Sequence, residues 1–451
     1  MTNGDDRLNL LEDLLKRASA AGADAADALF VEGISLSLAC RLGETEQLER
    51  SEGADLGLRV FKGNRQAIVS SSDVSSHALG ELVERAVAMA TAVPEDPFCG
   101  IADPDQIMAA HAVGAVDLDM AEPGEPTADI LKERALEAED AARAVAGITN
   151  SEGAGASWGR SAMAMAASNG FRGTRQNTRS GMSVSVLAGE GTAMERDYDF
   201  ASTVFSTDLP SPADLGRRAG EQTVARLNPR KVKSTQVPVV YAPRVSGSIL
   251  GHLSSAINGA AVARGTSFLK DCMGDQIFSD AITIVDDPLR KRGLRSKAFD
   301  GEGLKATHQN IIEKGVLKTW ILNLRSARQL GIAPSGHASR GTSSPPGSGV
   351  TNFYLEAGDV SPEDLMADIG EGLLITEMIG HGINYVTGDY SRGATGFWIE
   401  NGVATYPVSE ITIAGNLRDM FANVTAANDL QFRYGTDAPT LRIDGITIAG
   451  K

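Results

Sequence analysis

The chain contains 451 residues, of which 42% are hydrophobic and 22% are charged, and its formal net charge is −16. This composition is typical of globular proteins, and the length exceeds what one hydrophobic core normally organises, so two domains are expected. The acidic excess disfavours nucleic acid as a ligand, because nucleic-acid phosphates are bound by basic surfaces. The short basic stretch at 290–297 is too small to reverse that expectation.

The cellular location is predicted from three sequence features. Cys40, Cys99 and Cys272 lie far apart and form no CxxC pair, which is not the pattern of a disulfide framework. The chain begins with polar side chains rather than with the basic and apolar regions of a signal peptide. No run of ~18 apolar residues predicts a transmembrane helix. A cytoplasmic protein without a membrane partner is therefore expected.

The first half of the chain predicts helices that alternate with short strands. Leucines at helical spacing predict a helix over 6–21, and alternating apolar residues predict strands between 29 and 38. Gly63-Asn64 between two apolar runs indicates a hairpin turn, and the proline-rich segment 94–126 indicates irregular surface. By these criteria, helices are expected at 6–21, 76–92, 129–145 and 213–227, and strands at 29–31, 34–38, 57–61, 67–69, 163–167 and 182–187.

The fold class is predicted to be α+β with two domains. The order helix, strands, helix occurs twice before residue 228, which suggests an internal duplication within an N-terminal α/β domain at 1–228. A polar linker that contains Pro229 is expected at 229–237. The C-terminal domain at 238–451 is expected to be mostly β with a few inserted helices. Its predicted elements are a helix at 245–263 and strands at 237–241, 281–285, 396–399 and 410–414.

His252 lies in the predicted helix at 245–263 and invites comparison with zinc peptidases. The HExxH type needs two histidines one turn apart and a glutamate after the first as general base. Here Leu253 occupies the glutamate position, and Ala256 and Ile257 stand four and five residues after His252. One imidazole without a base cannot build that site, so His252 is interpreted as a partly buried histidine with a hydrogen-bond partner. No catalytic residue and no metal ligand is assigned, and the chain alone is predicted to be inactive.

Other catalytic patterns are also missing from the sequence. There is no G-x-S-x-G nucleophile motif and no glycine-rich phosphate-binding motif. The remaining histidines form no HxH or HxxxH pair; they are His77, His111, His308, His337 and His381. A metal site assembled from distant residues stays open as an alternative.

The most unusual segment is 380–402, whose six glycines let the backbone bend sharply and approach another chain closely. Its candidate substrate-binding residues are His381, Asp389, Tyr390, Ser391, Arg392 and Gly393. Two interpretations remain open. The segment forms a groove that holds an extended peptide through main-chain hydrogen bonds, or it forms tight hairpins in which an Asp389–Arg392 pair fixes a turn.

Two runs in the second half of the chain carry a family resemblance. Residues 388–402 read GDYSRGATGFWIENG, and residues 406–420 read YPVSEITIAGNLRDM. With shorter matches at 251–253, 267–269, 326–331 and 335–338, they resemble the PmbA/TldE branch of the TldD/PmbA metalloprotease family. The resemblance covers most of 238–420 and thins across the N-terminal domain.

The resemblance implies a division of labour between two kinds of subunit. The TldD-type subunit carries an HExxxH helix that binds zinc and cleaves unfolded or small polypeptides, and the PmbA/TldE-type subunit pairs with it and lacks that motif. In the equivalent helix, His252 stands at the first ligand position, Leu253 at the glutamate and Ile257 at the second histidine. The family's further cysteine ligand has no counterpart, since Cys272 is the last cysteine. These matches imply that this chain binds no cofactor and that zinc resides in a TldD-like partner.

The expected function is therefore a zinc-free subunit that forms part of a peptide chamber and stabilises a zinc-bearing partner, or that pairs with a second copy of itself. An older family label, modulator of DNA gyrase, is interpreted as indirect because the chain is acidic. Two alternatives remain. An independent hydrolase would be active in isolation, and a self-associating peptide-binding scaffold or regulator would occur in a genome without an HExxxH-bearing relative.

Overall fold

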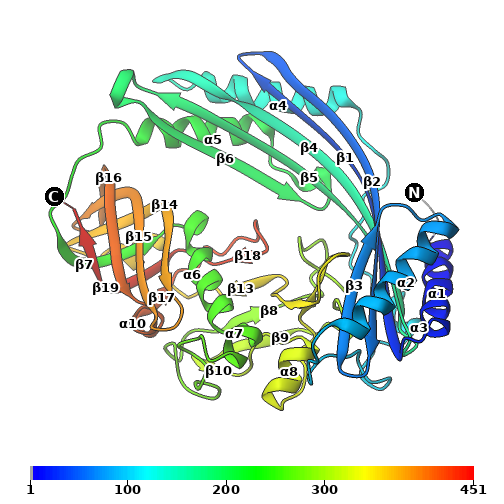
Figure 1. The fold of residues 1–451 in the computed structure, drawn as a ribbon. Helices are drawn as coiled ribbons and strands as arrows, with labels where there is room; N and C mark the ends of the chain where they lie inside the picture. The colour runs from blue at the N-terminus through cyan, green and yellow to red at the C-terminus, as the bar shows by residue number, and fades with distance from the viewer. Residues whose placement is uncertain (1–3, 451) are drawn as a thin grey trace.

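The computed structural model describes residues 4–450, in which a long sheet arches over a C-terminal part (Figure 1). This sheet is antiparallel, with the strand order β3-β2-β1-β4-β5-β6. Its strands are β1 (Ala25–Arg41), β2 (Glu44–Lys62), β3 (Arg65–Ser71), β4 (Ile148–Ala167), β5 (Arg172–Ala188) and β6 (Glu195–Thr203), and its helices are α1 (Gly4–Ala20), α2 (Ser76–Ala92), α4 (Ala128–Arg143) and α5 (Pro212–Ala225). The predicted order helix, strands, helix thus occurs twice, as α1-β1-β2-β3-α2 and α4-β4-β5-β6-α5.

The two faces of the long sheet have different neighbours because side chains alternate along each strand. Ala28 of β1 packs with Leu11 of α1 in one core, and residues of the same parity further along β1 pack against α4 and α5 in another. The opposite face carries Leu29 and Met163, which pack with Phe299 of the C-terminal part. One face is therefore covered by the four helices, and the other is turned toward the C-terminal part.

The strands of this sheet are longer than the sequence pattern predicts. β1 is one strand of 17 residues where two short strands were predicted, and β2 begins at Glu44. Residues 44–54 are exposed throughout, so they lack the alternation that marks a half-buried strand. The hairpin turn is confirmed, since Lys62 pairs with Arg65 around Gly63. The segment 94–126 is irregular as predicted, apart from the short helix α3 (Ala110–Val113).

The C-terminal part is rich in strands and contains a few short helices, as predicted, and its strands form two larger sheets. The first has the order β16-β15-β14-β7-β19-β17, and an additional β16–β19 pairing closes five of its strands into a ring, which lies at the left of Figure 1. Its strands are β7 (Thr235–Tyr241), β14 (Glu371–Asn384), β15 (Asp389–Glu400), β16 (Val403–Asn416), β17 (Val424–Ala426) and β19 (Leu441–Ala449). Because β7 begins at Thr235, part of the predicted linker at 229–237 is strand.

The second C-terminal sheet has the order β10-β9-β8-β13-β18. Its strands are β8 (Ile284–Asp286), β9 (Gln309–Glu313), β10 (Val316–Leu317), β13 (Phe353–Leu355) and β18 (Thr436–Asp437). A separate two-stranded pair and five helices complete this part: β11 (Ala338–Ser339), β12 (Gly347–Ser348), α6 (Pro243–Ala256), α7 (Gly259–Ala263), α8 (Leu324–Leu330), α9 (Pro362–Met366) and α10 (Leu417–Ala422). Among residues 4–450, no helix is long and apolar enough to cross a membrane.

The predicted helix at 245–263 is wrong in its extent, because α6 ends at Ala256 and α7 follows as a separate helix. The side chain of Asn258 accepts a hydrogen bond from the N–H of Ala260 and so begins α7. A Cβ atom at Gly259 would lie 2.6 Å from Leu322 Cδ2 and 3.0 Å from the carbonyl oxygen of Ile321, so a larger residue would force its neighbours to shift. The Asn-Gly pair is a turn signal that the apolar periodicity concealed.

Candidate functional site

Helix α6 (Pro243–Ala256) carries His252 on one side, whereas Leu253 and the following Ile257 are buried on the other side. Leu253 and Ile257 are both 0% exposed and belong to the main core of the C-terminal part. These are the positions at which a zinc peptidase of this type would need its glutamate and second histidine. The backbone of α6 therefore directs both positions into packed hydrocarbon.

His252 is held between two tyrosines that follow it by more than 130 residues. Its Nδ1 lies 3.0 Å from the hydroxyl of Tyr385, and its ring meets the ring of Tyr390 edge to face with 5.6 Å between centroids. Burial lowers the pKa of His252 to about 4, and the charges of Arg392 and His381 act in the same direction. The imidazole is therefore neutral at neutral pH, and the predicted hydrogen-bond partner is Tyr385.

Strand alternation divides the candidate substrate-binding residues of β15 between two faces. Tyr390 is buried beside His252, and its pKa is raised to about 12 by that burial. Arg392 lies on the same face, two residues along the strand. Asp389, Ser391 and Gly393 lie on the opposite face, where Ser391 is exposed. The structure thus brings Tyr390 and Arg392 to His252 and does not bring the other three.

His381 lies in a bulge of β14. Ile379 pairs with Gly393 and Gly382 pairs with Ser391. Two residues of β14, Gly380 and His381, therefore stand opposite the single residue Arg392 of β15. The side chain of His381 is exposed, and its charge reaches His252. The structure therefore places His381 at the edge of the cluster around His252.

Strand β15, the central part of the glycine-rich segment, has no free edge for a peptide. β15 pairs with β14 on one side and with β16 on the other. A Cβ atom at Gly396 would lie 1.9 Å from the carbonyl oxygen of Leu374, so this glycine permits close approach within the sheet. Main-chain binding of an added strand along β15 is therefore excluded.

The turn before β15 is fixed by other partners than the expected Asp389–Arg392 pair. One carboxylate oxygen of Asp389 accepts a hydrogen bond from the Thr387 hydroxyl at 2.6 Å, and the other accepts from the Asn416 side chain at 3.3 Å. Arg392 points to the other face of the strand. The interpretation in which Asp389 and Arg392 pair to fix a turn is therefore wrong, because strand alternation separates the two side chains.

A cavity of about 440 Å³ opens beside the polar side of α6. Its walls come from α6, β14, β15, β6 and two loops, and they include Tyr198, Arg244, Ser248, Gly251, Arg295, Thr376, Glu377, Met378, Arg392 and Tyr434. Ser248 stands one turn before His252 on the same helix, so the cavity and the histidine share one side of α6.

Three residues that line this cavity carry a buried polar atom without a hydrogen-bond partner within the described residues: Ser248 Oγ, Thr376 Oγ1 and Arg392 Nε. His252 Nε2, one helix turn after Ser248, is a fourth such atom beside the cavity. Buried polar groups are nearly always paired, because an unpaired group costs about 1–3 kcal/mol. Four such atoms together indicate a place for water or for a polar ligand.

The donor set around His252 does not fit zinc. Structural and catalytic zinc sites use three or four imidazole, thiolate or carboxylate ligands, whereas His252 is surrounded by phenols and by the guanidinium of Arg392. Within residues 4–450, no group of three or more His, Cys, Asp or Glu side chains is arranged to hold a metal ion. A guanidinium next to the imidazole would also repel a cation.

Sequence reasoning missed several residues of this site. Ser248 could have been found, since it lies four residues before His252 and therefore on the same helix face. Tyr385 lies within the glycine-rich segment 380–402 but was not singled out as a site residue, and Thr376 belongs to no sequence motif; it stands at an irregularity of β14 between Ile375 and Glu377.

Comparisons with known proteins agree along the whole chain. Residues 26–90, 121–227 and 234–450 match domain 1, the central domain and the C-terminal domain of PmbA/TldA metallopeptidases. Metalloprotease PmbA of Escherichia coli O157:H7 is 36% identical over 447 residues, covering 98% of this chain and 96% of that protein. A PmbA homolog of Haemophilus influenzae is 36% identical over 439 residues, covering 96% and 94%.

Solved structures share the fold. A Bacteroides thetaiotaomicron protein, named for modulation of DNA gyrase, superposes with a TM-score of 0.92 at 26% identity and full coverage of both chains. TldE of Thermococcus kodakarensis superposes with a TM-score of 0.85 at 20% identity, covering 98% of this chain and 100% of that one, which shows the fold alone. With three matched domains and relatives above 30% identity over nearly its full length, this chain belongs to the PmbA/TldD family of metallopeptidases.

Proposed function

We propose that this chain is a zinc-free, peptide-binding subunit of a TldD/PmbA-type peptidase that acts in the cytoplasm with a TldD-like, zinc-bearing partner. The observation that carries the proposal is the environment of α6. The positions for the base and the second ligand, Leu253 and Ile257, are sealed in the core, whereas the opposite side of the helix opens on a polar cavity. The fold of a peptidase is thus combined with a site suited to binding rather than to metal chemistry.

The cavity offers groups that a peptide can use. Arg392 has a buried Nε–H without an acceptor, which can donate to a carbonyl or carboxylate oxygen. Beside the cavity, neutral His252 has one ring nitrogen without a partner, which can donate or accept according to its tautomer. These groups would position a polypeptide segment while the zinc-bearing partner cleaves it. The same binding would stabilise the assembled pair, because a ligand shared by two subunits favours their association.

Zinc content tests this division of labour. The untagged chain is analysed by elemental mass spectrometry, alone and after mixing with an HExxxH-bearing relative and removing unbound metal. We expect zinc well below one per chain in isolation and close to one per pair after mixing. Stoichiometric zinc in the isolated chain would overturn the proposal and favour an independent hydrolase.

Arg392→Gln tests whether the cavity takes part in peptide binding. Losing a buried charged donor is expected to reduce peptide turnover by the assembled pair about tenfold or more, mainly through KM. Ser391→Glu is the matched control, since it changes the charge by the same amount on the exposed face of β15. Size-exclusion chromatography checks that both variants still assemble. Equal turnover by the two variants would remove Arg392 from the binding site.

A further inference from the structure

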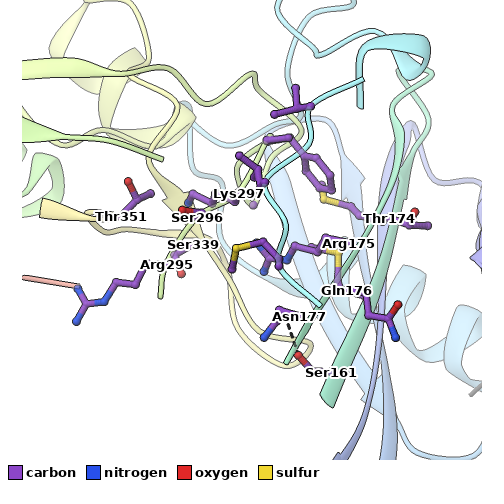
Figure 2. A pocket seen from close by; sticks show the side chains of 18 of the residues that line it. Ser161, Thr174, Arg175, Gln176, Asn177, Arg295, Ser296, Lys297, Ser339 and Thr351 are labelled. Carbon is purple, nitrogen blue, oxygen red and sulfur yellow. Dashed lines mark hydrogen bonds between the residues drawn. The ribbon is translucent and has the colours of Figure 1, made fainter. Parts of the chain in front are cut away.

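A second cavity, of about 720 Å³, lies between the long sheet and the C-terminal part. Figure 2 shows Ser161, Arg175 and Asn177 of the long sheet, together with Arg295, Ser296, Lys297, Ser339 and Thr351 of the C-terminal part. Cavities of roughly 300–1,000 Å³ are typical of small-molecule sites. Arg295 also lines the cavity beside α6, so the two cavities are neighbours.

Arg175 is placed in this cavity by strand register. It pairs with Met163 of β4, and Met163 in turn pairs with Val31 of β1. The three side chains therefore form a row on the sheet face that is turned toward the C-terminal part. This row puts a guanidinium next to apolar side chains at the wall of the cavity.

The charge of Arg175 is not compensated. Its side chain is accessible from the cavity, yet it has no hydrogen bond or ion pair with any of residues 4–450. Its guanidinium N–H groups are therefore available to a ligand in the cavity.

The acidic residues near this cavity are already engaged. Asp117 lies 3.2 Å from Lys291, and Asp119 lies 2.6 Å from Arg292. These two carboxylates are therefore balanced by cations at the rim, and neither pairs with Arg175.

Lys297 supplies a second cation from the opposite wall. Its ammonium group donates to the carbonyl oxygen of Ala338 at 3.1 Å, and burial lowers its pKa. The nearby carboxylate of Asp300 is held by three backbone N–H groups, those of Glu302, Leu304 and Ala338. Lys297 therefore keeps donors that a ligand in the cavity can use.

We propose that this cavity binds a monocarboxylate joined to an apolar body, with Arg175 as the principal carboxylate partner. A guanidinium can grip a carboxylate through two parallel hydrogen bonds. The apolar body would pack on Leu29, Val31, Met163, Met165 and Phe299.

The source of the carboxylate is inferred to be the C-terminus of a short peptide. This part rests on the proposed function, because it takes the adjoining cavity beside α6 as a peptide site that continues past Arg295. The carboxylate site itself rests only on Arg175 and its surroundings. The zinc measurement therefore tests the proposed function separately, and its failure would leave the carboxylate site in place.

Isothermal titration calorimetry of the full chain tests the proposal with four probes: N-acetyl-Ala-Leu-Leu with a free C-terminus, the same peptide as its amide, hexanoate, and inorganic phosphate. We expect the free acid to bind, and the amide to bind at least about tenfold more weakly, because it loses a charge-assisted hydrogen-bond pair. Arg175→Gln should weaken the free acid by a similar factor. Arg179→Gln should leave binding unchanged, since this arginine lies on the same strand and bonds Ser202 outside the cavity.

Comparing the probes and the two arginine variants distinguishes the possible ligands. Hexanoate binding that depends on Arg175, without binding of the peptide, would support the carboxylate site and replace the peptide with a small acid as its source. Equal binding of acid and amide, equal affinity in the two arginine variants, tighter binding of inorganic phosphate, or no binding of any probe would overturn the proposal.

Discussion

His252 is almost fully buried, and only one of its two ring nitrogens has a hydrogen-bond partner. Its Nδ1 meets Tyr385, whereas its Nε2 is buried without a partner. The pKa of about 4 follows from burial first and from Arg392 and His381 second. A histidine of this kind is kept neutral, which suits hydrogen bonding to a ligand and is unsuited to proton transfer near pH 7.

Protonation of His252 should destabilise the fold in a defined pH window. The folded-state pKa lies below the ordinary value of 6.5, so the contribution of neutral His252 is present above pH 6.5 and is lost as the pH falls toward 4. Between pH 7 and pH 5 this loss amounts to roughly 2 kcal/mol. Urea unfolding of the protein and of His252→Gln at both values measures it. The variant should lose about 2 kcal/mol less on acidification, and an identical pH dependence would contradict the burial of a neutral imidazole.

Helices α4 and α5 show at the element scale how closely the layer over the long sheet is packed. A Cβ atom at Gly216 of α5 would lie 2.1 Å from the carbonyl oxygen of Ala138 in α4. The backbones of the two helices therefore approach each other at a position where only glycine fits. Gly80 of α2, by contrast, has no atom near its missing Cβ within 4 Å.

Alanine at these two helical glycines should have opposite effects on stability. Gly216→Ala forces α4 and α5 apart and is expected to cost about 1–3 kcal/mol. Gly80→Ala meets open space and should stabilise α2 by up to about 1 kcal/mol, because alanine has the higher helix propensity. Chemical denaturation of both variants measures the difference. A stable Gly216→Ala variant would show that the two helices can separate without loss of packing.

A buried network of charges joins the two parts of the whole molecule. Asp27 of β1 forms ion pairs with Arg59 of β2 and with Arg340 of the C-terminal part, and all three side chains are almost fully buried. Glu302 lies 4.0 Å from Arg59 and accepts a hydrogen bond from the N–H of Leu324. Burial is the main reason that the pKa of Glu302 rises to about 7.

Ionisation of Glu302 should weaken the fold as the pH rises. Its folded-state pKa lies above the ordinary value of 4.5, so its contribution is fully present below pH 4.5 and is lost as the pH rises through 7. Glu302→Gln keeps an acceptor for Leu324 and removes the buried charge. This variant should gain roughly 2 kcal/mol more relative to the native protein at pH 8 than at pH 5, measured by urea unfolding. A gain that is equal at both values would show that Glu302 is ionised throughout.

Local pattern was sufficient where local forces decide structure. The sequence predicted helix α1, the hairpin turn at Gly63 and the α+β class, and it showed that the zinc motif is missing at His252. These features depend on hydrophobic periodicity, turn residues and ligand spacing, which are all properties of residues close together in the sequence. The length of β2 could not be predicted, since residues 44–54 are exposed on both faces and are held as a strand by pairing with β1.

The sequence by itself determined the family, the fold class and the apolar character of Leu253 and Ile257. Only the tertiary structure decided which polar groups share a site. Tyr385 reaches His252 across 133 residues, and Arg392 turns toward α6 while Asp389 turns away. Arg175 lines the cavity only because the pairing of β5 with β4 places it on the sheet face that is turned toward the C-terminal part. The physical reason is that pairing, burial and pKa depend on neighbours in space, and strand register brings these together from distant parts of the chain.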